Sequence, residues 1–101
     1  MFRRYRDVME TVDLIRLTTL RHWIKSGTAM RLRKDAGLSQ SQVAAVCGVS
    51  AAAVSRWEAA RRTPRGEPAF RYAWLLTEIE RVLKENATGA GGSMGRALGS
   101  Q

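Results

Sequence analysis

The stretch that decides the fold is Ser39–Glu58, SQSQVAAVCGVSAAAVSRWE, in which a glycine separates two short helical patterns. Ser39 and Gln42 have the spacing of a capping box, in which a serine hydroxyl and a glutamine side chain bond free amides at a helix start. Gly48 then ends the first helix, because glycine adopts the left-handed conformation without steric cost. Ser50 supplies a second N-cap hydroxyl. The pattern predicts a helix-turn-helix.

The second helix of this pair has two dissimilar faces. Val54 and Trp57 are three residues apart, which predicts that one side packs on a core. The opposite side is small and neutral apart from one arginine, so it can approach another surface closely. A helix of this shape fits the major groove of double-stranded DNA. The residues of this outer face are Ala51, Ala52, Ser55, Arg56 and Ala59.

The composition is that of one small basic domain. Among 101 residues, 17 Lys and Arg against nine Asp and Glu give a formal net charge of +8, which favours nucleic acid or an anionic membrane as a partner. No apolar run approaches the roughly 20 residues that span a bilayer, and the N-terminus lacks the apolar segment of a signal peptide. We therefore expect a cytoplasmic protein, associated with a bacterial nucleoid or present in a phage-infected host cell.

Neither catalysis nor metal binding is predicted. Cys47 is the only cysteine and lies on the apolar face of its helix, so we expect a buried thiol and no internal disulfide. His22 is the only histidine and has no neighbours at metal-ligand spacing. Paired carboxylates, a serine–histidine pattern and a glycine-rich phosphate loop are not found. We expect no enzymatic activity, no metal and no cofactor.

Two segments at the N-terminus carry alternative interpretations. Residues 1–6, MFRRYR, are either a solvated, frayed start or a basic arm that lies along phosphates or enters a minor groove. Residues 7–26 contain neither Gly nor Pro and predict an additional N-terminal helix. Its apolar positions occupy more than one face, so it either packs only on the core or also forms a homodimer surface.

The candidate dimer surface extends to the last predicted helix. That helix has Pro68 in its first turn and runs to about Lys84. Trp74 falls on its polar side and either covers the edge of the core or contacts a partner. The inward stripe is Tyr72, Ala73, Leu76, Ile79 and Leu83. The candidate dimer residues are Ile15, Leu17, Leu20 and Trp74.

The remaining segments are turns and a tail. Thr28 is expected to cap a helix that reaches about Asp35 and ends at Gly37. After Glu58, Pro and Gly predict a loop that gathers three arginines, either as a solvated cluster or as a phosphate-contacting one. These arginines are Arg61, Arg62 and Arg65. Residues 87–101 are rich in Gly and Ser and predict a disordered tail.

The residues from Thr28 to about Ile79 resemble the Cro and phage-repressor type of helix-turn-helix, also called the xenobiotic-response-element (XRE) class. The resemblance lies in MRLRKDAGLSQSQVAAVCGVSAAAVSRWEAARRTP, with its Leu-Ser-Gln helix start, Gly-Val-Ser turn and Ser-Arg-Trp-Glu helix end. It implies an all-α fold, a compact lambda-repressor-like bundle of about five helices that places a recognition helix in the major groove. The DNA-binding domain would span residues 27–86, preceded by the additional helix.

The resemblance also implies residue roles. Gln40 would bond a DNA phosphate, and Arg33 with Glu58 would form a structural ion pair between the first helix of the domain and the end of the recognition helix. The base-facing positions are Ser50, Ala51, Ala52, Ser55 and Arg56.

This chain departs from the family at two places. Ala51 and Ala52 replace long polar residues, so Arg56 becomes the main candidate for base reading; a bidentate arginine–guanine contact is worth roughly 1–3 kcal/mol of discrimination. Ala60 stands where the family commonly has glycine. A left-handed alanine costs about 1–2 kcal/mol, so the recognition helix either accepts that cost or ends differently.

These observations lead us to expect a sequence-specific transcriptional regulator that binds double-stranded DNA, a phage or mobile-element repressor that binds operator half-sites as a homodimer. Phosphate contacts would come from Gln40, Arg61, Arg62 and Arg65. The alternative is an antitoxin-like interaction module whose N-terminal helix binds a protein partner and whose helix-turn-helix autoregulates. Membrane adsorption is not expected, because the arginines gather in a loop and not on an amphipathic helix.

Overall fold

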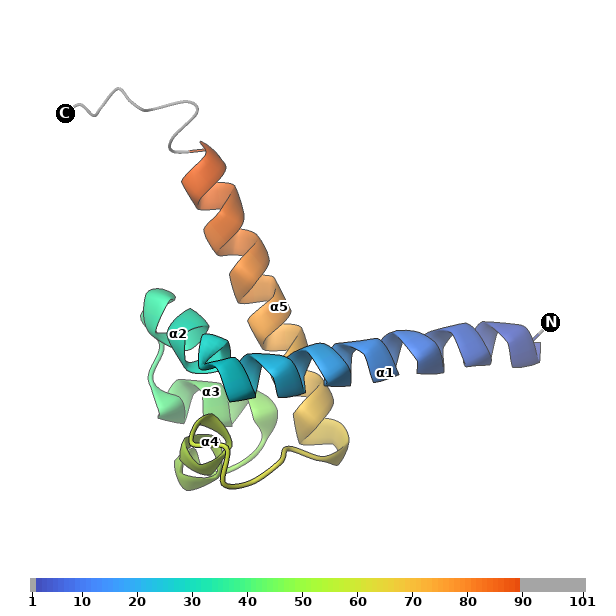
Figure 1. Ribbon diagram of the computed structural model, residues 1–101, viewed down its shortest axis with the longest axis horizontal. Helices are drawn as coiled ribbons and strands as arrows, with labels where there is room; N and C mark the ends of the chain where they lie inside the picture. Colours follow the sequence, from blue (N-terminus) through green and yellow to red (C-terminus); the bar gives the residue numbers. More distant parts are fainter. Residues whose placement is uncertain (1, 90–101) are drawn as a thin grey trace.

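Helices alone build the part of the chain that the structure, a computed structural model, describes: the backbone of residues 2–89 and the side chains of residues 11–87 (Figure 1). The order is α1 (Phe2–Ser26), α2 (Thr28–Asp35), α3 (Gln40–Cys47), α4 (Ala51–Glu58) and α5 (Gly66–Gly89). The predicted all-α bundle is confirmed. Most of the predicted tail, residues 90–101, lies outside the described residues, and residues 87–89 belong to α5.

The turn between α3 and α4 forms as its sequence predicts. The Gln42 amide donates to Ser39 Oγ at 3.0 Å, and the Ser39 amide donates to Gln42 Oε1 at 2.8 Å, which completes the capping box. Gly48 is left-handed at φ 76°, and its amide donates to the Ala44 carbonyl. Ser50 Oγ then accepts the Ala53 amide at 3.1 Å. These local bonds fix where α3 ends and α4 begins.

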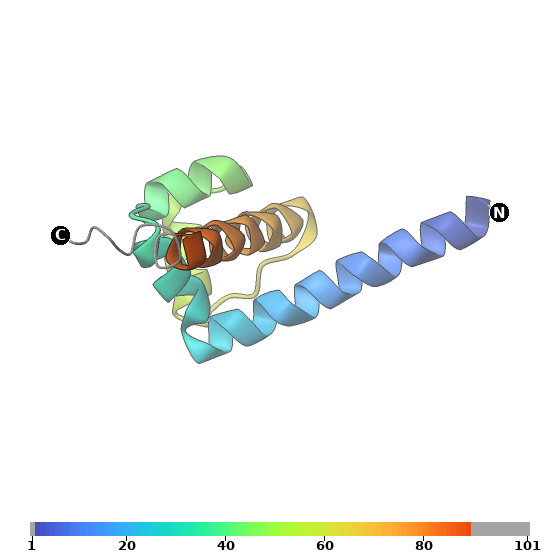
Figure 2. The same cartoon turned by 90° about the horizontal axis from the view of Figure 1, so that it is seen from above.

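The N-terminal helix is longer than predicted and is not separate from the bundle. α1 begins at Phe2, so residues 2–6 are helical and continuous with residues 7–26. Its C-terminal half crosses α5, while its N-terminal half extends away from the other helices (Figure 2). Leu20 and Ile24, 1% and 8% exposed, complete the core of the domain.

One core connects all five helices. Trp57 of α4 packs against Tyr72 of α5, with ring centroids 4.9 Å apart and an interplanar angle of 33°. Burial raises the pKa of the Cys47 thiol to about 11, in agreement with its predicted place inside. The buried apolar residues are Leu20, Ile24, Ala29, Leu32, Val43, Ala44, Cys47, Val54, Trp57, Ala69, Tyr72, Ala73, Leu76 and Ile79.

The start of α2 differs from its prediction. The N-cap is Gly27, left-handed at φ 82°, which has no side chain to cap the helix, and the Thr28 amide donates to Ser26 Oγ at 3.4 Å. The Thr28 hydroxyl instead lies 2.8 Å from the Ser26 hydroxyl. Since Gly27 makes a tight turn directly after Ser26, α2 leaves α1 with no room for an N-cap residue in extended conformation.

The end of α4 is strained. Ala60 is left-handed at φ 59°, and the Arg61 amide donates to the Arg56 carbonyl at 2.9 Å while the Ala60 amide donates to the Trp57 carbonyl at 3.0 Å. This is the Schellman arrangement, which glycine normally occupies. Of the two alternatives that the sequence left open, the structure shows the left-handed alanine, with its steric cost, and not a helix that ends differently.

We expect Ala60→Gly to stabilise the protein. Relief of the left-handed strain outweighs the extra backbone entropy of glycine in the unfolded chain, for a net gain of about 0.5–1 kcal/mol in the free energy of unfolding. Urea denaturation followed by circular dichroism measures it.

The matched control is Ala59→Gly, because Ala59 is right-handed at φ −82° and gains no relief. This variant should lose about 0.5–1 kcal/mol. Equal effects of the two substitutions would contradict the strain at Ala60.

Candidate nucleic-acid interface

A buried ion pair between Arg33 and Glu58 holds the end of α4 against α2. Arg33 Nε donates to Glu58 Oε2 at 2.5 Å, and Arg33 Nη2 donates to Glu58 Oε1 at 3.0 Å. The two side chains are only 10% and 3% exposed. Arg33 Nη1 also donates to the Leu38 carbonyl at 2.9 Å. One guanidinium therefore connects α2, the turn before α3 and the last residue of α4.

Hydrogen bonding and burial have opposite effects on the pKa of Arg33. The hydrogen bonds that Arg33 donates to Glu58 raise the pKa of Arg33 above its ordinary value, and desolvation by burial opposes this rise. The pair is bidentate, which is the strongest arrangement that a guanidinium and a carboxylate form. Each of the two buried groups therefore depends on the other for compensation inside the domain.

Gln40 extends the network to the edge of the interface. Its half-buried side chain donates from Nε2 to Glu58 Oε1 at 3.0 Å. A carboxylate accepts only, which fixes the amide nitrogen as the atom that faces it. The second N–H and the carbonyl oxygen of the amide remain available at the start of α3. Glu58 thus positions the side chain to which the sequence assigned a phosphate contact.

The outer face of α4 is bare and accessible. Ser50, Ala52, Ser55 and Arg56 are exposed, whereas Ala51 is half-buried. On the opposite side the buried Val54 and Trp57 bind the helix to the core. The Arg56 guanidinium rises from a surface of small side chains, so it reaches farther than any other group on this face.

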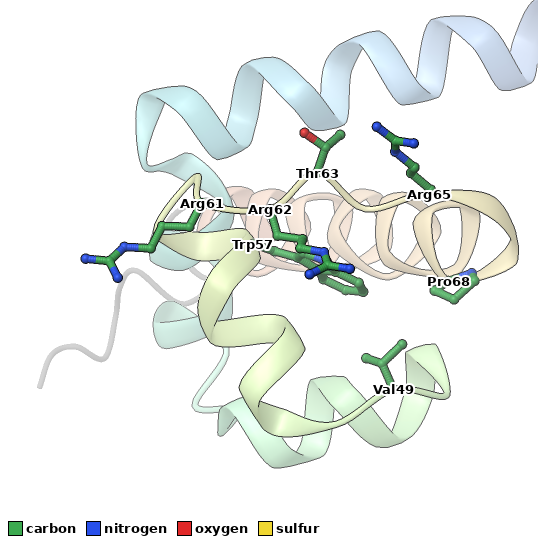
Figure 3. Close-up of a pocket in the computed structure, with 7 residues that line it drawn as sticks. All are labelled: Val49, Trp57, Arg61, Arg62, Thr63, Arg65 and Pro68. Atoms are coloured by element: carbon green, nitrogen blue, oxygen red, sulfur yellow. The ribbon is translucent and has the colours of Figure 1, made fainter.

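The arginines after α4 surround an open depression of about 630 Å³. Arg61, Arg62 and Arg65 are all exposed. Figure 3 shows Arg62 directed toward the Trp57 side of the depression, whereas Arg61 points away from it. The lining residues are Val49, Trp57, Arg61, Arg62, Thr63, Arg65 and Pro68. Polar and cationic groups predominate, and no carboxylate lines the depression.

Charge is segregated around this surface. Between Asp35 and Glu67 the only acidic residue is Glu58, which is buried against Arg33, while four exposed arginines lie in the same segment. The other ion pairs that residues 11–87 form lie within α5. The interface is therefore uniformly positive, as a surface that binds a polyanion requires.

The candidate dimer residues are not brought together. Ile15 is 59% exposed and Trp74 is 52% exposed, but Leu17 is half-buried against the core and Leu20 is 1% exposed. The inclusion of Leu20 in an exposed surface was wrong, because Leu20 belongs to the buried core of the domain. Leu14, which is 64% exposed, was missed. Leu14 lies six residues before Leu20, which places the two residues on different faces of the helix. This spacing could have indicated that Leu14 is exposed if Leu20 is buried.

We expect Glu58→Gln to destabilise the domain strongly. The variant leaves the Arg33 charge buried and poorly compensated, a loss of about 3–5 kcal/mol. Denaturant unfolding measures it. Glu67→Gln is the control, because the Glu67–Arg71 pair is exposed, at 3.3 Å, and exposed pairs contribute about 0–1 kcal/mol. A Glu58→Gln loss no larger than that of the control would contradict the structural role.

Comparison with known proteins agrees with this geometry. The family model described as Helix-turn-helix matches residues 30–74, which contain Arg33, Glu58 and the whole of α3 and α4. No curated protein and no solved structure matches the chain. Within the described residues, no helix is long and apolar enough to cross a membrane, and no group of His, Cys, Asp and Glu is arranged to hold a metal ion. Residues 30–74 therefore form a helix-turn-helix domain of the XRE type, which supports a DNA-binding role in transcription regulation.

Proposed function

We propose that this protein is a sequence-specific repressor of a phage or mobile element that binds two operator half-sites as a homodimer. The observation that carries the proposal is the outer face of α4, where small exposed side chains and one arginine lie opposite the buried Val54 and Trp57. A helix held firmly on one side and bare on the other can enter a major groove to the depth at which Arg56 meets base edges.

Base reading would centre on Arg56. Its guanidinium is exposed and forms no ion pair among residues 11–87, so both of its terminal nitrogens are free to bond guanine O6 and N7. Ser50, Ala52 and Ser55 surround it on the same exposed face. Ala52 can contact a thymine methyl. Ala51 is half-buried and contributes less to this surface than the sequence suggested.

Phosphate contacts would fix the position of α4 along the groove. Gln40 lies at the start of α3 with one N–H free, and Arg61, Arg62 and Arg65 follow the end of α4. The recognition helix is therefore preceded and followed by phosphate-binding groups. Such contacts set register without reading sequence.

Dimerisation would place two recognition helices in successive major grooves, about 34 Å apart. The exposed apolar residues Leu14 and Ile15 are neighbours in the middle of α1. Trp74, on α5, is also exposed and apolar. Apolar groups gathered on one exposed stretch of helix favour a protein contact there.

Selection from a randomised DNA library, followed by binding measurements on the selected site, tests base reading. Arg56→Ala should relax the preference at one base pair by roughly 1–3 kcal/mol. Arg62→Ala should weaken binding to all sequences and flatten the dependence of log K on log salt by about 0.9. Recovery of all library sequences by the wild type, or an unchanged preference in Arg56→Ala, would reject the readout assignment.

Dimerisation is tested by sedimentation of the free chain and of its complex with the selected site. Ile15→Glu should shift the free protein toward the monomer and lower operator affinity at least ten-fold, roughly the loss of 1.4 kcal/mol. Val82→Glu is the control, because Val82 is an exposed apolar residue on a different helix, α5. Similar behaviour of the two variants would exclude this part of α1 from the interface.

The same exposed residues of α1 support one alternative, an antitoxin-like module in which α1 binds a protein partner and the helix-turn-helix autoregulates. Purification from the native host distinguishes the two. A stoichiometric heterologous partner that Ile15→Glu releases would favour the antitoxin-like module, whereas recovery of a homodimer favours the repressor.

A further inference from the structure

Two basic residues of α1 border the arginine-rich loop although they lie outside the matched helix-turn-helix residues. Arg21 and Lys25 line a depression of about 220 Å³ together with Arg62 and Thr63. Arg21 also lines a second depression, of about 360 Å³, together with Arg65. In Figure 3 the side chains of Thr63 and Arg65 point toward α1. The loop and α1 therefore share one continuous border.

Arg21 and Lys25 occupy one face of α1. They are four residues apart, which places them one turn apart on the same side of the helix. Both are exposed, whereas their sequence neighbours Leu20 and Ile24 are buried in the core. The buried pair fixes the rotation of α1, and this rotation directs the basic pair along the edge of the loop.

No carboxylate neutralises this group of cations. The residues that line the two depressions include no Asp or Glu. Neither Arg21 nor Lys25 forms an ion pair among residues 11–87. Four cations from two elements, Arg21, Lys25, Arg62 and Arg65, therefore lie close together with only repulsion between them. A bound polyanion would remove that repulsion.

A local explanation accounts for only one of these residues. Lys25 lies in the last turn of α1, where a cation interacts favourably with the helix dipole. Arg21 is a full turn earlier, and the dipole effect falls off within the last turn. Arg21 lies beside both depressions, and within the described part of the protein its side chain has no ion-pair partner.

We propose that Arg21 and Lys25 bind the DNA backbone, so that α1 continues the phosphate-contacting surface of the loop beyond the helix-turn-helix. This proposal rests on the proposed function, because it assigns further contacts to the same DNA. The contacts are electrostatic and sequence-independent. They extend the bound surface to an element that the family match does not include.

The test compares Arg21→Gln/Lys25→Gln with Arg31→Gln/Lys84→Gln in binding to a mixed-sequence DNA duplex over a range of NaCl concentrations. The control removes the same charge from a depression beside the C-terminal half of α5, where Arg31 and Lys84 lie with Asp35 and Glu80. Loss of two phosphate contacts should flatten the dependence of log K on log salt by about 1.8 and lower affinity about ten-fold at physiological salt. The control should leave the salt dependence unchanged.

Three results overturn the proposal, and they are distinguishable. If the α1 variant keeps the wild-type salt dependence while Arg61→Gln/Arg62→Gln loses part of it, DNA binding stands and α1 has no part in it. If the control variant loses as much of its salt dependence as the α1 variant, the effect follows net charge and not the position of Arg21 and Lys25. If the wild type binds no duplex, the proposed function itself fails. Circular dichroism establishes that each variant retains its helical content.

Discussion

The buried pair of Arg33 and Glu58 is the interaction on which the geometry of the interface depends. The carboxylate accepts two hydrogen bonds from Arg33 and one from Gln40, and the same guanidinium reaches the Leu38 carbonyl. The first helix of the domain, the start of α3 and the end of α4 therefore cannot rotate independently. Apolar packing alone tolerates small rotations, whereas directed bonds between buried ions do not. In the proposed complex, this network would set the angle at which α4 meets DNA.

The second constraint on α4 is the way it ends. Val54 and Trp57 hold its inner side, with Trp57 against Tyr72, and its last turn closes through the left-handed Ala60. The backbone bonds around Ala60 turn the chain sharply, so that Arg61 and Arg62 directly follow the end of α4. The strain at Ala60 thus has a consequence for the surface, because it brings cations to the end of the helix that carries Arg56.

Features that depend on neighbouring residues were predictable from the sequence, and features that depend on tertiary packing were not. The caps at Ser39, Gly48 and Ser50 are local, and each forms as predicted. At Ala60 the sequence left two alternatives, because the steric cost of a left-handed alanine opposes the backbone hydrogen bonds that end the helix there. The misplacement of Leu20 and the omission of Arg21 have one cause. Periodicity identifies the faces of a helix but not which face meets α5 or the loop, and only the crossing of α1 with α5 decides that.

α1 gives the bundle a feature that the helix-turn-helix segment lacks. Its C-terminal half supplies Leu20 and Ile24 to the core, and its middle exposes Leu14 and Ile15. Both segments belong to one uninterrupted helix. In the proposed dimer, a contact made at Ile15 would be connected rigidly to the face that carries Arg21. The positions of the two recognition helices would then be set by the same element that binds the backbone beside each of them, which couples dimer geometry to half-site spacing.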